Sequence, residues 1–225
     1  MRRTVAAGLG WAIVAAVPAI VVGNALWVLL NPWLADAQYA LPGFPDDSYG
    51  LDREQRSELA AIGIRSIRPL GDGVQLLRDA RLPNGTPAFQ AREIRHMADV
   101  RDLVAGFAVA WAVGLALALA GAAALLRLEG PRAVRAAFAR GALATLAVMA
   151  LLAVFMVVAF GAFFASFHGL FFEGDSWRFS DTATLRRLYP DSFWAIAAAA
   201  LAALVAAQAA VVALALRRGR RSDRA

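Results

Sequence analysis

Residues 167–179 read FHGLFFEGDSWRF, and they stand where a long apolar run gives way to a charged segment. The run covers residues 141–166 and contains no ionisable side chain, and His168 is the first to follow. An uncharged apolar stretch of this length is typical of a helix that crosses a membrane. The motif therefore predicts a helix that leaves the hydrocarbon layer with a histidine at its end. Ionisable residues at membrane depth are costly, so such a position marks a functional site by default.

The composition of the whole chain agrees with this interpretation. Its 225 residues are 60% hydrophobic, a share far above that of a soluble domain. The sequence contains no cysteine, which excludes disulfides, thiolate nucleophiles and cysteine-bound metals. The net charge is +6 and every basic residue is arginine, but the distribution of this charge indicates membrane orientation and not nucleic-acid binding.

Hydropathy divides the chain into four predicted spans, since about 20 helical residues cross a hydrocarbon core of about 30 Å. We expect an all-α membrane protein, a single integral membrane domain over residues 1–225 with a small extracytoplasmic cap between spans one and two. The predicted spans are residues 9–30, 103–126, 141–167 and 193–216, the cap is 31–102, and the second extracytoplasmic loop is 168–192.

The first apolar segment has an alternative interpretation. Met1, Arg2 and Arg3 precede it and the sequence Ala-Asp-Ala follows at residues 35–37, as in a secretory signal with a cleavage site. The segment is longer than the apolar part of such signals, which favours an uncleaved first span.

The cap contains local signals for a helix and for a turn. Asp52 is a good N-cap and Gln55 stands at the capping-box position, which predicts a helix from there to about Arg68. Residues 74–81 fit a helix or a strand, and residues 83–87, PNGTP, predict a turn. About 70 residues with few large apolar side chains predict a cap on the membrane and not an independent domain.

Arginine is unevenly distributed between the two sides that four spans create. The N-terminus, the 127–140 linker and the tail together hold 11 arginines and 2 acids, whereas the cap and the second loop hold 12 arginines and 15 acids. Short loops rich in arginine stay in the cytoplasm. We therefore predict a multi-pass protein of the cytoplasmic membrane with both termini on the cytoplasmic side.

The chain has two histidines, and hairpin geometry predicts that they meet. Spans two and three form an antiparallel hairpin whose linker has its midpoint near residue 133, and His96 and His168 average to position 132. Residues equally far from the turn lie at equal depth, and this mismatch corresponds to roughly 4–5 Å along the helix axis. Because neighbouring helices pack about 8–10 Å apart, we expect the two rings within about 10 Å of each other, near the outer interface and facing lipid.

Charged neighbours surround each histidine. On a helix, Glu93 and Asp99 each lie three residues from His96, so both carboxylates can reach its imidazole, fix its tautomer and raise its basicity. Asp175 follows His168 across a turn that contains two glycines, and it could do the same for the second ring. The further supporting candidates in these motifs are Arg92, Arg95 and Trp177.

The residues alone leave three interpretations of the histidines open. The pair could be catalytic, it could ligate a haem b between facing helices, or the two rings could serve only as polar anchors in a structural membrane protein. The crowding of acids and the interfacial position weigh against haem. Ser166 is a weak nucleophile candidate, because side chains two residues apart on a helix do not face each other.

Several motifs together resemble a known family. EIRHMADV (93–100) ahead of a span, FHGLFFEGDSWRF after one and LYPDSFW (188–194) opening the next are similar to motifs of the bacterial lipoprotein intramolecular transacylase family, as are Tyr49-Gly50 and RLPNGTPAF (81–89). The resemblance implies a four-span membrane acyltransferase of lipoprotein maturation. It implies transfer of the sn-2 acyl chain of a diacylglyceryl-cysteine to the α-amine of that cysteine, which leaves a lyso-form lipoprotein. The essential histidines of the family would correspond to His96 and His168.

This chemistry matches the residues present. Aminolysis of an ester needs a base, a proton donor for the departing oxygen and stabilisation of the oxyanion, and histidine can perform both proton transfers. The dipole at a helix C-terminus favours His168 as the primary base and His96 as its partner, while Arg92 or Arg95 could stabilise the oxyanion. We expect diacylglyceryl-modified lipoproteins and membrane lipids as partners, no cofactor and no metal.

Overall fold

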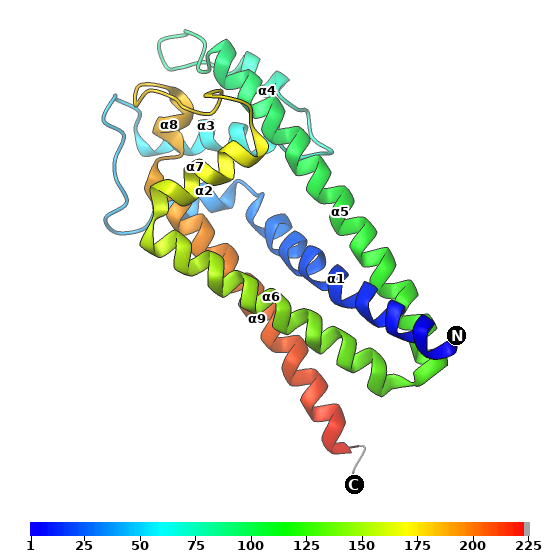
Figure 1. Ribbon diagram of the computed structural model, residues 1–225. Coiled ribbons are helices and arrows are strands. Elements are labelled where there is room, and N and C mark those ends of the chain that lie inside the picture. The colour runs from blue at the N-terminus through cyan, green and yellow to red at the C-terminus, as the bar shows by residue number, and fades with distance from the viewer. Residues whose placement is uncertain (223–225) are drawn as a thin grey trace. The chain divides into compact units, whose positions relative to one another are not determined.

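The computed structural model describes the backbone of residues 1–222 and the side chains of residues 1–212. The chain forms two compact units (Figure 1). The first, here the membrane unit, consists of Met1–Leu26, Ala108–Val157 and the chain from Ala200 onward. The second, here the cap unit, consists of Trp27–Phe107 and Val158–Ala199.

Helices make up the regular structure of both units, and the described residues contain no strand beyond one isolated bridge between Arg81 and Pro87. The helices are α1 (Arg2–Leu29), α2 (Trp33–Tyr39), α3 (Arg53–Ser66), α4 (Gln75–Asp79), α5 (Ala91–Glu129), α6 (Pro131–Val158), α7 (Phe160–Phe171), α8 (Thr184–Leu188) and α9 (Asp191–Ser222). Four of them, α1, α5, α6 and α9, are long and apolar enough to cross a membrane. The predicted all-α membrane fold is confirmed.

The segment predicted as the third span, 141–167, falls on two helices. Helix α6 ends at Val158, Ala159 has non-helical dihedral angles (φ −147°, ψ 57°), and α7 begins at Phe160. Two β-branched valines precede the break and Gly161 follows it, and these are weaker helix formers than the leucines and alanines of α6. As a result His168 lies in the last turn of the short helix α7, and not at the end of one long helix.

The membrane unit is built around α1. Ile13, Val17 and Val21 are almost completely buried, and they pack with residues of α5, α6 and α9. A Cβ atom on Gly141 would lie 2.7 Å from the Cβ of Val17, so α6 approaches α1 at a distance that only glycine permits. Close backbone approach at small residues is the usual source of helix association in lipid, where burial of apolar surface gives no driving force.

One polar cluster joins helices of the membrane unit, and its members satisfy each other. The indole N–H of Trp111 donates to Asn24 Oδ1 (2.9 Å), and Asn24 Nδ2 donates to Gln208 Oε1 (3.0 Å). Gln208 Nε2 in turn donates to the carbonyl oxygens of Val21 and Leu204, both at 3.2 Å. The cluster therefore links α1, α5 and α9 through hydrogen bonds that compensate for placing polar groups among apolar helices.

The start of α1 lies at the same end of the membrane unit as the α5–α6 connection (Figure 1). A guanidinium N–H of Arg2 donates to the carbonyl oxygen of Leu128. The four-span topology requires this proximity, because it places the N-terminus and the 127–140 linker on one side.

The cap unit contains the capping box expected at Asp52. Its carboxylate accepts from the Gln55 N–H (2.9 Å), and the Gln55 side chain accepts from the Asp52 N–H (3.2 Å). The helix α3 that follows ends at Ser66. The ambiguous 74–81 segment contains the short helix α4, and the PNGTP turn closes with Gly85 at φ +82°, a conformation that favours glycine.

A buried ion pair holds the loop before α3 to α8. Arg187 Nη2 lies 2.8 Å from Asp47 Oδ2, and the two side chains are only 9% and 1% exposed. Burial opposes ionisation of Asp47, but the hydrogen bond from Arg187, the Leu51 N–H and the charge of Arg187 outweigh it and lower the pKa of this carboxyl. Next to this pair, the Arg56 guanidinium donates to the carbonyl oxygens of Pro45 (2.8 Å) and Arg187 (2.9 Å).

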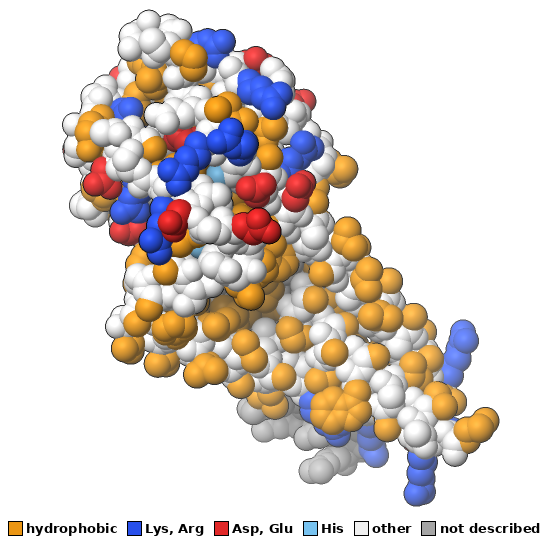
Figure 2. Space-filling view, turned by 45° about the horizontal axis from the view of Figure 1, so that its top comes forward, with side chains coloured by type: hydrophobic (Ala, Val, Ile, Leu, Met, Phe, Trp, Pro, Cys, Tyr) orange, Lys and Arg blue, Asp and Glu red, His pale blue; other side chains and the backbone are white. Residues whose placement is uncertain are grey.

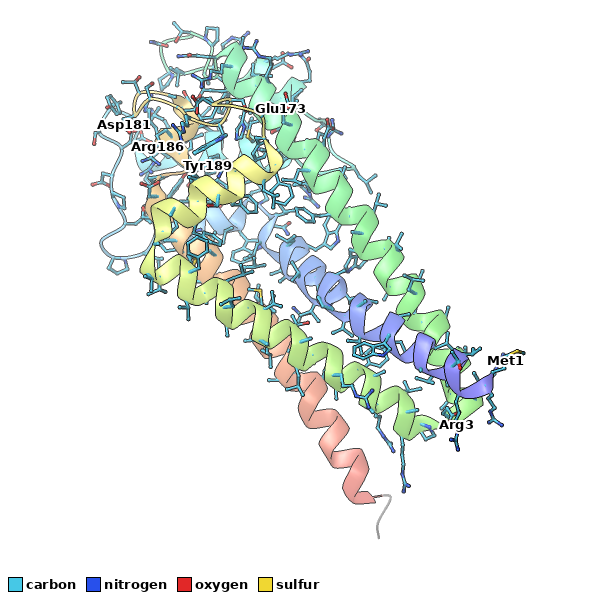
Figure 3. All side chains as sticks on the ribbon, in the orientation of Figure 1. Met1, Arg3, Glu173, Asp181, Arg186 and Tyr189 are labelled. Atoms are coloured by element: carbon cyan, nitrogen blue, oxygen red, sulfur yellow. The ribbon has the colours of Figure 1, made fainter. Side chains whose placement is uncertain are left out.

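A second ion cluster lies at the start of α9. Arg186, which Figure 3 labels near Asp181 and Tyr189, pairs with Asp191 (2.5 Å) and with Asp181 (3.5 Å). On the face shown in Figure 2, arginine and acidic side chains gather over the cap unit, while hydrophobic side chains dominate the surface of the membrane unit. The charge pattern of the cap unit is that of a water-facing surface.

Candidate active site

The two histidines meet inside the cap unit. His96 lies in the second turn of α5 and His168 in the last turn of α7, and their ring centroids are 6.4 Å apart with the planes 24° from parallel. The side chains are 8% and 9% exposed. The prediction that the rings lie within about 10 Å of each other is confirmed.

The His168 ring has one defined tautomer. Its Nδ1 lies 2.8 Å from the carbonyl oxygen of Phe164, one turn earlier on α7. A carbonyl oxygen can only accept a hydrogen bond, so Nδ1 must carry the proton. Nε2 therefore has its lone pair free, which is the state that a general base requires.

An aromatic cluster encloses both rings. Phe172 contacts both, with centroids 4.9 Å from His96 and 5.6 Å from His168. Phe179 lies 5.4 Å from His96, while Trp177 and Phe164 lie 4.6 Å and 4.1 Å from His168. Only a trace of histidine surface is visible on the face shown in Figure 2. The pair thus lies largely buried among aromatic side chains.

His96 differs from His168 in its hydrogen bonding. Its Nδ1 is buried and has no hydrogen-bond partner among the residues that the structure describes. A buried polar atom without a partner costs free energy of about 1–3 kcal/mol. Native structures retain such atoms where they have a role other than stability.

The predicted partnership of Glu93 with His96 is wrong. Glu93 is 1% exposed, and its carboxylate accepts from the backbone N–H groups of Gln90 (2.7 Å) and Leu185 (2.8 Å). The side chain thereby joins the start of α5 to α8. One carboxylate oxygen binds the backbone of Leu185, which lies 92 residues away in the sequence. The spacing of residues along one helix cannot predict such a long-range partner.

The predicted partnership of Asp175 with His168 is also wrong. The exposed Asp175 carboxylate pairs with Arg178 Nε at 3.2 Å, while His168 Nδ1 uses the Phe164 carbonyl. The backbone of Asp175 has a different function, because its carbonyl oxygen accepts from the Arg92 guanidinium. The Arg92 guanidinium carbon also lies 5.4 Å from the Phe179 ring centre, so Arg92 fixes the loop after α7 against α5.

The remaining candidates border an open cleft. The cleft has a volume of about 340 Å³ and reaches His96 from the outside of α5. Asp99 and Arg95 are exposed residues of its wall, but no hydrogen bond joins either of them to His96 Nδ1. The complete lining is Arg92, Arg95, His96, Ala98, Asp99 and Ser176.

Sequence reasoning missed the most direct partners of the histidines. The Phe164 carbonyl could have been found, since a side chain in a helix can bond to the backbone four residues earlier. The sequence gives no signal that Phe172 and Phe179 contact the site, because aromatic residues in a membrane protein usually pack or face lipid. Their approach to His96 depends on the fold of the loop after α7.

The aromatic cluster does not fit a haem. Phe172 packs against both imidazole rings, in the space where a porphyrin would have to lie between its two ligands. The arrangement is suited instead to moving protons within an enclosed apolar site.

The fold and the site define a class of protein: an integral membrane protein with four apolar helices and a buried histidine pair. Comparison with protein families identifies the family within this class. The model of the family described as lipoprotein intramolecular transacylase Lit matches residues 13–194. The chain therefore belongs to the Lit family, as the sequence motifs had indicated.

The chain is also similar to individual proteins. An uncharacterized protein of Aquifex aeolicus is 28% identical over 178 residues, which cover 79% of this chain and 78% of the relative. The crystallised lipoprotein intramolecular transacylase Lit of Bacillus cereus superposes with a TM-score of 0.79 at 18% identity, over 100% of this chain and 98% of that one. A variant of the Bacillus protein with one histidine replaced by arginine gives a TM-score of 0.68 at 16% identity, over 100% and 94% of the two chains. The structural matches show a shared fold.

Proposed function

We propose that this protein transfers the sn-2 acyl chain of a diacylglyceryl-modified cysteine to the α-amine of the same cysteine, which yields a lyso-form lipoprotein. Membership of the Lit family supports lipoprotein transacylation in general. The observation that carries the mechanism is the buried pair of histidine rings, 6.4 Å apart, with one tautomer fixed by the Phe164 carbonyl.

His168 serves as the general base in this proposal. The α-amine of the cysteine attacks the ester carbonyl carbon, and a proton of the nitrogen passes to His168 Nε2. Two features support the role: the Nδ1 hydrogen bond leaves Nε2 free, and the ring lies in the last turn of α7, where the helix dipole favours the imidazolium that forms. The C–N bond forms and a tetrahedral intermediate carries the negative charge on the former carbonyl oxygen.

Collapse of the intermediate breaks the bond between the acyl carbon and the glyceryl oxygen. The departing oxygen takes up one proton, so the reaction neither consumes nor releases protons overall. His96 assists this proton transfer to the glyceryl oxygen and orients the substrate beside His168. Because the nucleophile and the ester belong to one molecule, correct positioning supplies much of the acceleration and no covalent enzyme intermediate is needed.

The arginine distribution supports an orientation with both termini in the cytoplasm and the histidines near the outer leaflet of the bacterial cytoplasmic membrane. That depth suits the substrate, because the acyl chains of a lipoprotein remain in the membrane while its peptide lies outside. Diacylglyceryl-modified lipoproteins and membrane lipids are the partners that this placement requires.

The test is expression of the full chain in a bacterium that lacks the activity and makes a known diacylated lipoprotein. Mass spectrometry of the N-terminal lipopeptide should show one acyl chain on the cysteine nitrogen and one on the glyceryl group, with total mass unchanged. Tandem fragmentation locates the N-acyl group. An unmodified α-amine, with the protein present in the membrane at normal abundance, would contradict the proposed function.

A further inference from the structure

The proposed reaction needs a hydrogen-bond donor that the histidines do not supply. The tetrahedral intermediate places a negative charge on the former carbonyl oxygen of the acyl chain, and a donor aimed at this oxyanion is commonly the largest single contribution to catalysis. The two arginines considered from sequence are exposed, and Arg92 already bonds to the Asp175 carbonyl. The hydrogen-bond donor for the oxyanion must therefore lie inside the aromatic cluster.

Trp177 carries a donor of the required kind. Its indole Nε1 is closed off from solvent and has no acceptor among the residues that the structure describes. Indole nitrogen can only donate, so this group has no alternative way to be satisfied. Leaving such a donor unpaired costs about 1–3 kcal/mol, a cost that a bound substrate oxygen would remove.

The position of Trp177 is adjacent to the base. Its ring centroid lies 4.6 Å from that of His168, with the planes 33° from parallel. The two rings therefore pack in a tilted arrangement, and the indole N–H makes no hydrogen bond to the imidazole. Since the rings are in contact, an acyl carbonyl that reaches the edge of His168 can also reach the indole N–H.

The loop after α7 holds this indole in place. Gly174 has φ +56° and allows the chain to turn, and the Arg178 N–H closes the turn on the Asp175 carbonyl (3.1 Å). The Arg178 guanidinium carbon lies 5.0 Å from the Trp177 ring centre, and Arg92 bonds to the Asp175 carbonyl oxygen from α5. A donor fixed before the substrate arrives needs no reorganisation in the transition state.

We propose that Trp177 is a catalytic residue whose indole N–H donates a hydrogen bond to the acyl carbonyl oxygen as it becomes the oxyanion. No covalent bond to the enzyme forms, and the indole keeps its proton throughout. This inference rests on the proposed transacylase function and adds the oxyanion donor to it.

The test removes the N–H and keeps the ring. Trp177 is replaced by β-(3-benzothienyl)alanine, in which sulfur stands for the indole N–H, and kcat and KM are measured with a synthetic diacylglyceryl lipopeptide. Loss of one oxyanion donor lowers kcat by about 10²-fold or more, and we expect KM to change by less than about threefold. The unfolding temperature should not fall, because the replaced group made no hydrogen bond in the folded protein.

A second readout follows the hydrogen bond itself. With ¹⁵N-labelled indole groups, the Trp177 signal is assigned by its loss in Trp177→Phe. It should move downfield when a phosphonate analogue of the lipopeptide binds, since this analogue carries a tetrahedral anion at the acyl position. The matched control is Trp111→Phe, which removes an indole N–H from the membrane unit and should leave kcat within about twofold.

The outcomes separate the two proposals. If the benzothienyl variant had the same kcat as the wild type, the donor role would be overturned and the proposed function would stand. The same holds if the Trp177 signal did not shift when the phosphonate bound. A fall in kcat matched by an equal loss of folded protein would also overturn it. Failure of the wild-type enzyme to convert the lipopeptide would overturn the function and the donor role together.

Discussion

Two tryptophans show how the polar groups of the two units differ in hydrogen bonding. In the membrane unit, the Trp111 indole N–H donates to Asn24, which is itself bonded to Gln208. In the cap unit, the Trp177 indole N–H is buried without an acceptor among the described residues, and the ring centroids of Trp177 and His168 are 4.6 Å apart. The same chemical group is satisfied where it supports the fold and unsatisfied where it borders the histidines.

The contrast extends to the rest of the described side chains. Every buried side-chain atom without a hydrogen-bond partner belongs to the cap unit. The atoms that border the candidate site are His96 Nδ1 and Trp177 Nε1. Because such atoms reduce stability, their presence beside the histidine pair is consistent with a site that is completed by its substrate. Changes at satisfied groups should therefore lower stability, and changes at His96 and Trp177 should lower activity alone.

The largest effect on activity outside the base itself is expected at His96. His96→Leu introduces an apolar side chain of similar volume and removes both ring nitrogens. Acyl transfer should therefore fall by about 10²-fold or more. Removing a nitrogen that has no partner should leave the unfolding temperature close to that of the wild type. Initial rates and thermal unfolding in one detergent measure both. If His96→Leu were less stable than the wild type but kept its activity, His96 would support the fold and not the reaction.

Asp47 should show the opposite behaviour. Asp47→Asn leaves the buried Arg187 without its counter-ion, and breaking such a pair typically costs about 3–5 kcal/mol. The folded-state pKa of Asp47 lies below its ordinary value, so the wild-type pair stabilises the fold above about pH 4 and is lost as the pH falls through the folded pKa.

Thermal unfolding of wild type and Asp47→Asn between pH 7 and pH 3 measures this difference. The gap between the two proteins should be widest at neutral pH and should narrow in acid. A gap that is constant with pH would show that ionisation of Asp47 does not contribute to stability.

Glu93→Gln distinguishes a structural from a catalytic carboxylate. The amide keeps one oxygen for the Gln90 or Leu185 N–H but leaves the other N–H unsatisfied, which should cost about 1–3 kcal/mol. Activity per folded molecule should stay within a fewfold of wild type. A large fall in kcat at normal protein abundance would show that Glu93 takes part in catalysis.

The smallest effect is expected at Trp111. Trp111→Phe removes the donor to Asn24 in the membrane unit, and we expect a loss of about 1 kcal/mol in stability. Activity per folded molecule should not change, because no residue of the histidine site belongs to this cluster. Quantitative membrane abundance together with the lipopeptide assay tests both statements.

Parts of this account could be predicted from sequence because they depend on local or periodic geometry. The rise of a helix fixes the depth of residues along a hairpin, which brought His96 and His168 together, and the capping box at Asp52 lies within four residues. The partners of the site depend on long-range contacts instead. Glu93 bonds to Leu185, and the break at Ala159 that creates α7 has no strong signal such as proline.

The central claim is that His168 Nε2 removes the proton from the attacking amine. The most direct measurement is the initial rate of lipopeptide conversion by purified wild type, His168→Ala and His168→Asn, with folded enzyme quantified in each sample. The Asn variant keeps an N–H where Nδ1 donates to the Phe164 carbonyl and lacks a nitrogen at the Nε2 position. We predict that neither variant forms lyso-form lipopeptide above the uncatalysed rate. Conversion at near wild-type rate by a folded variant would show that His168 is not the base.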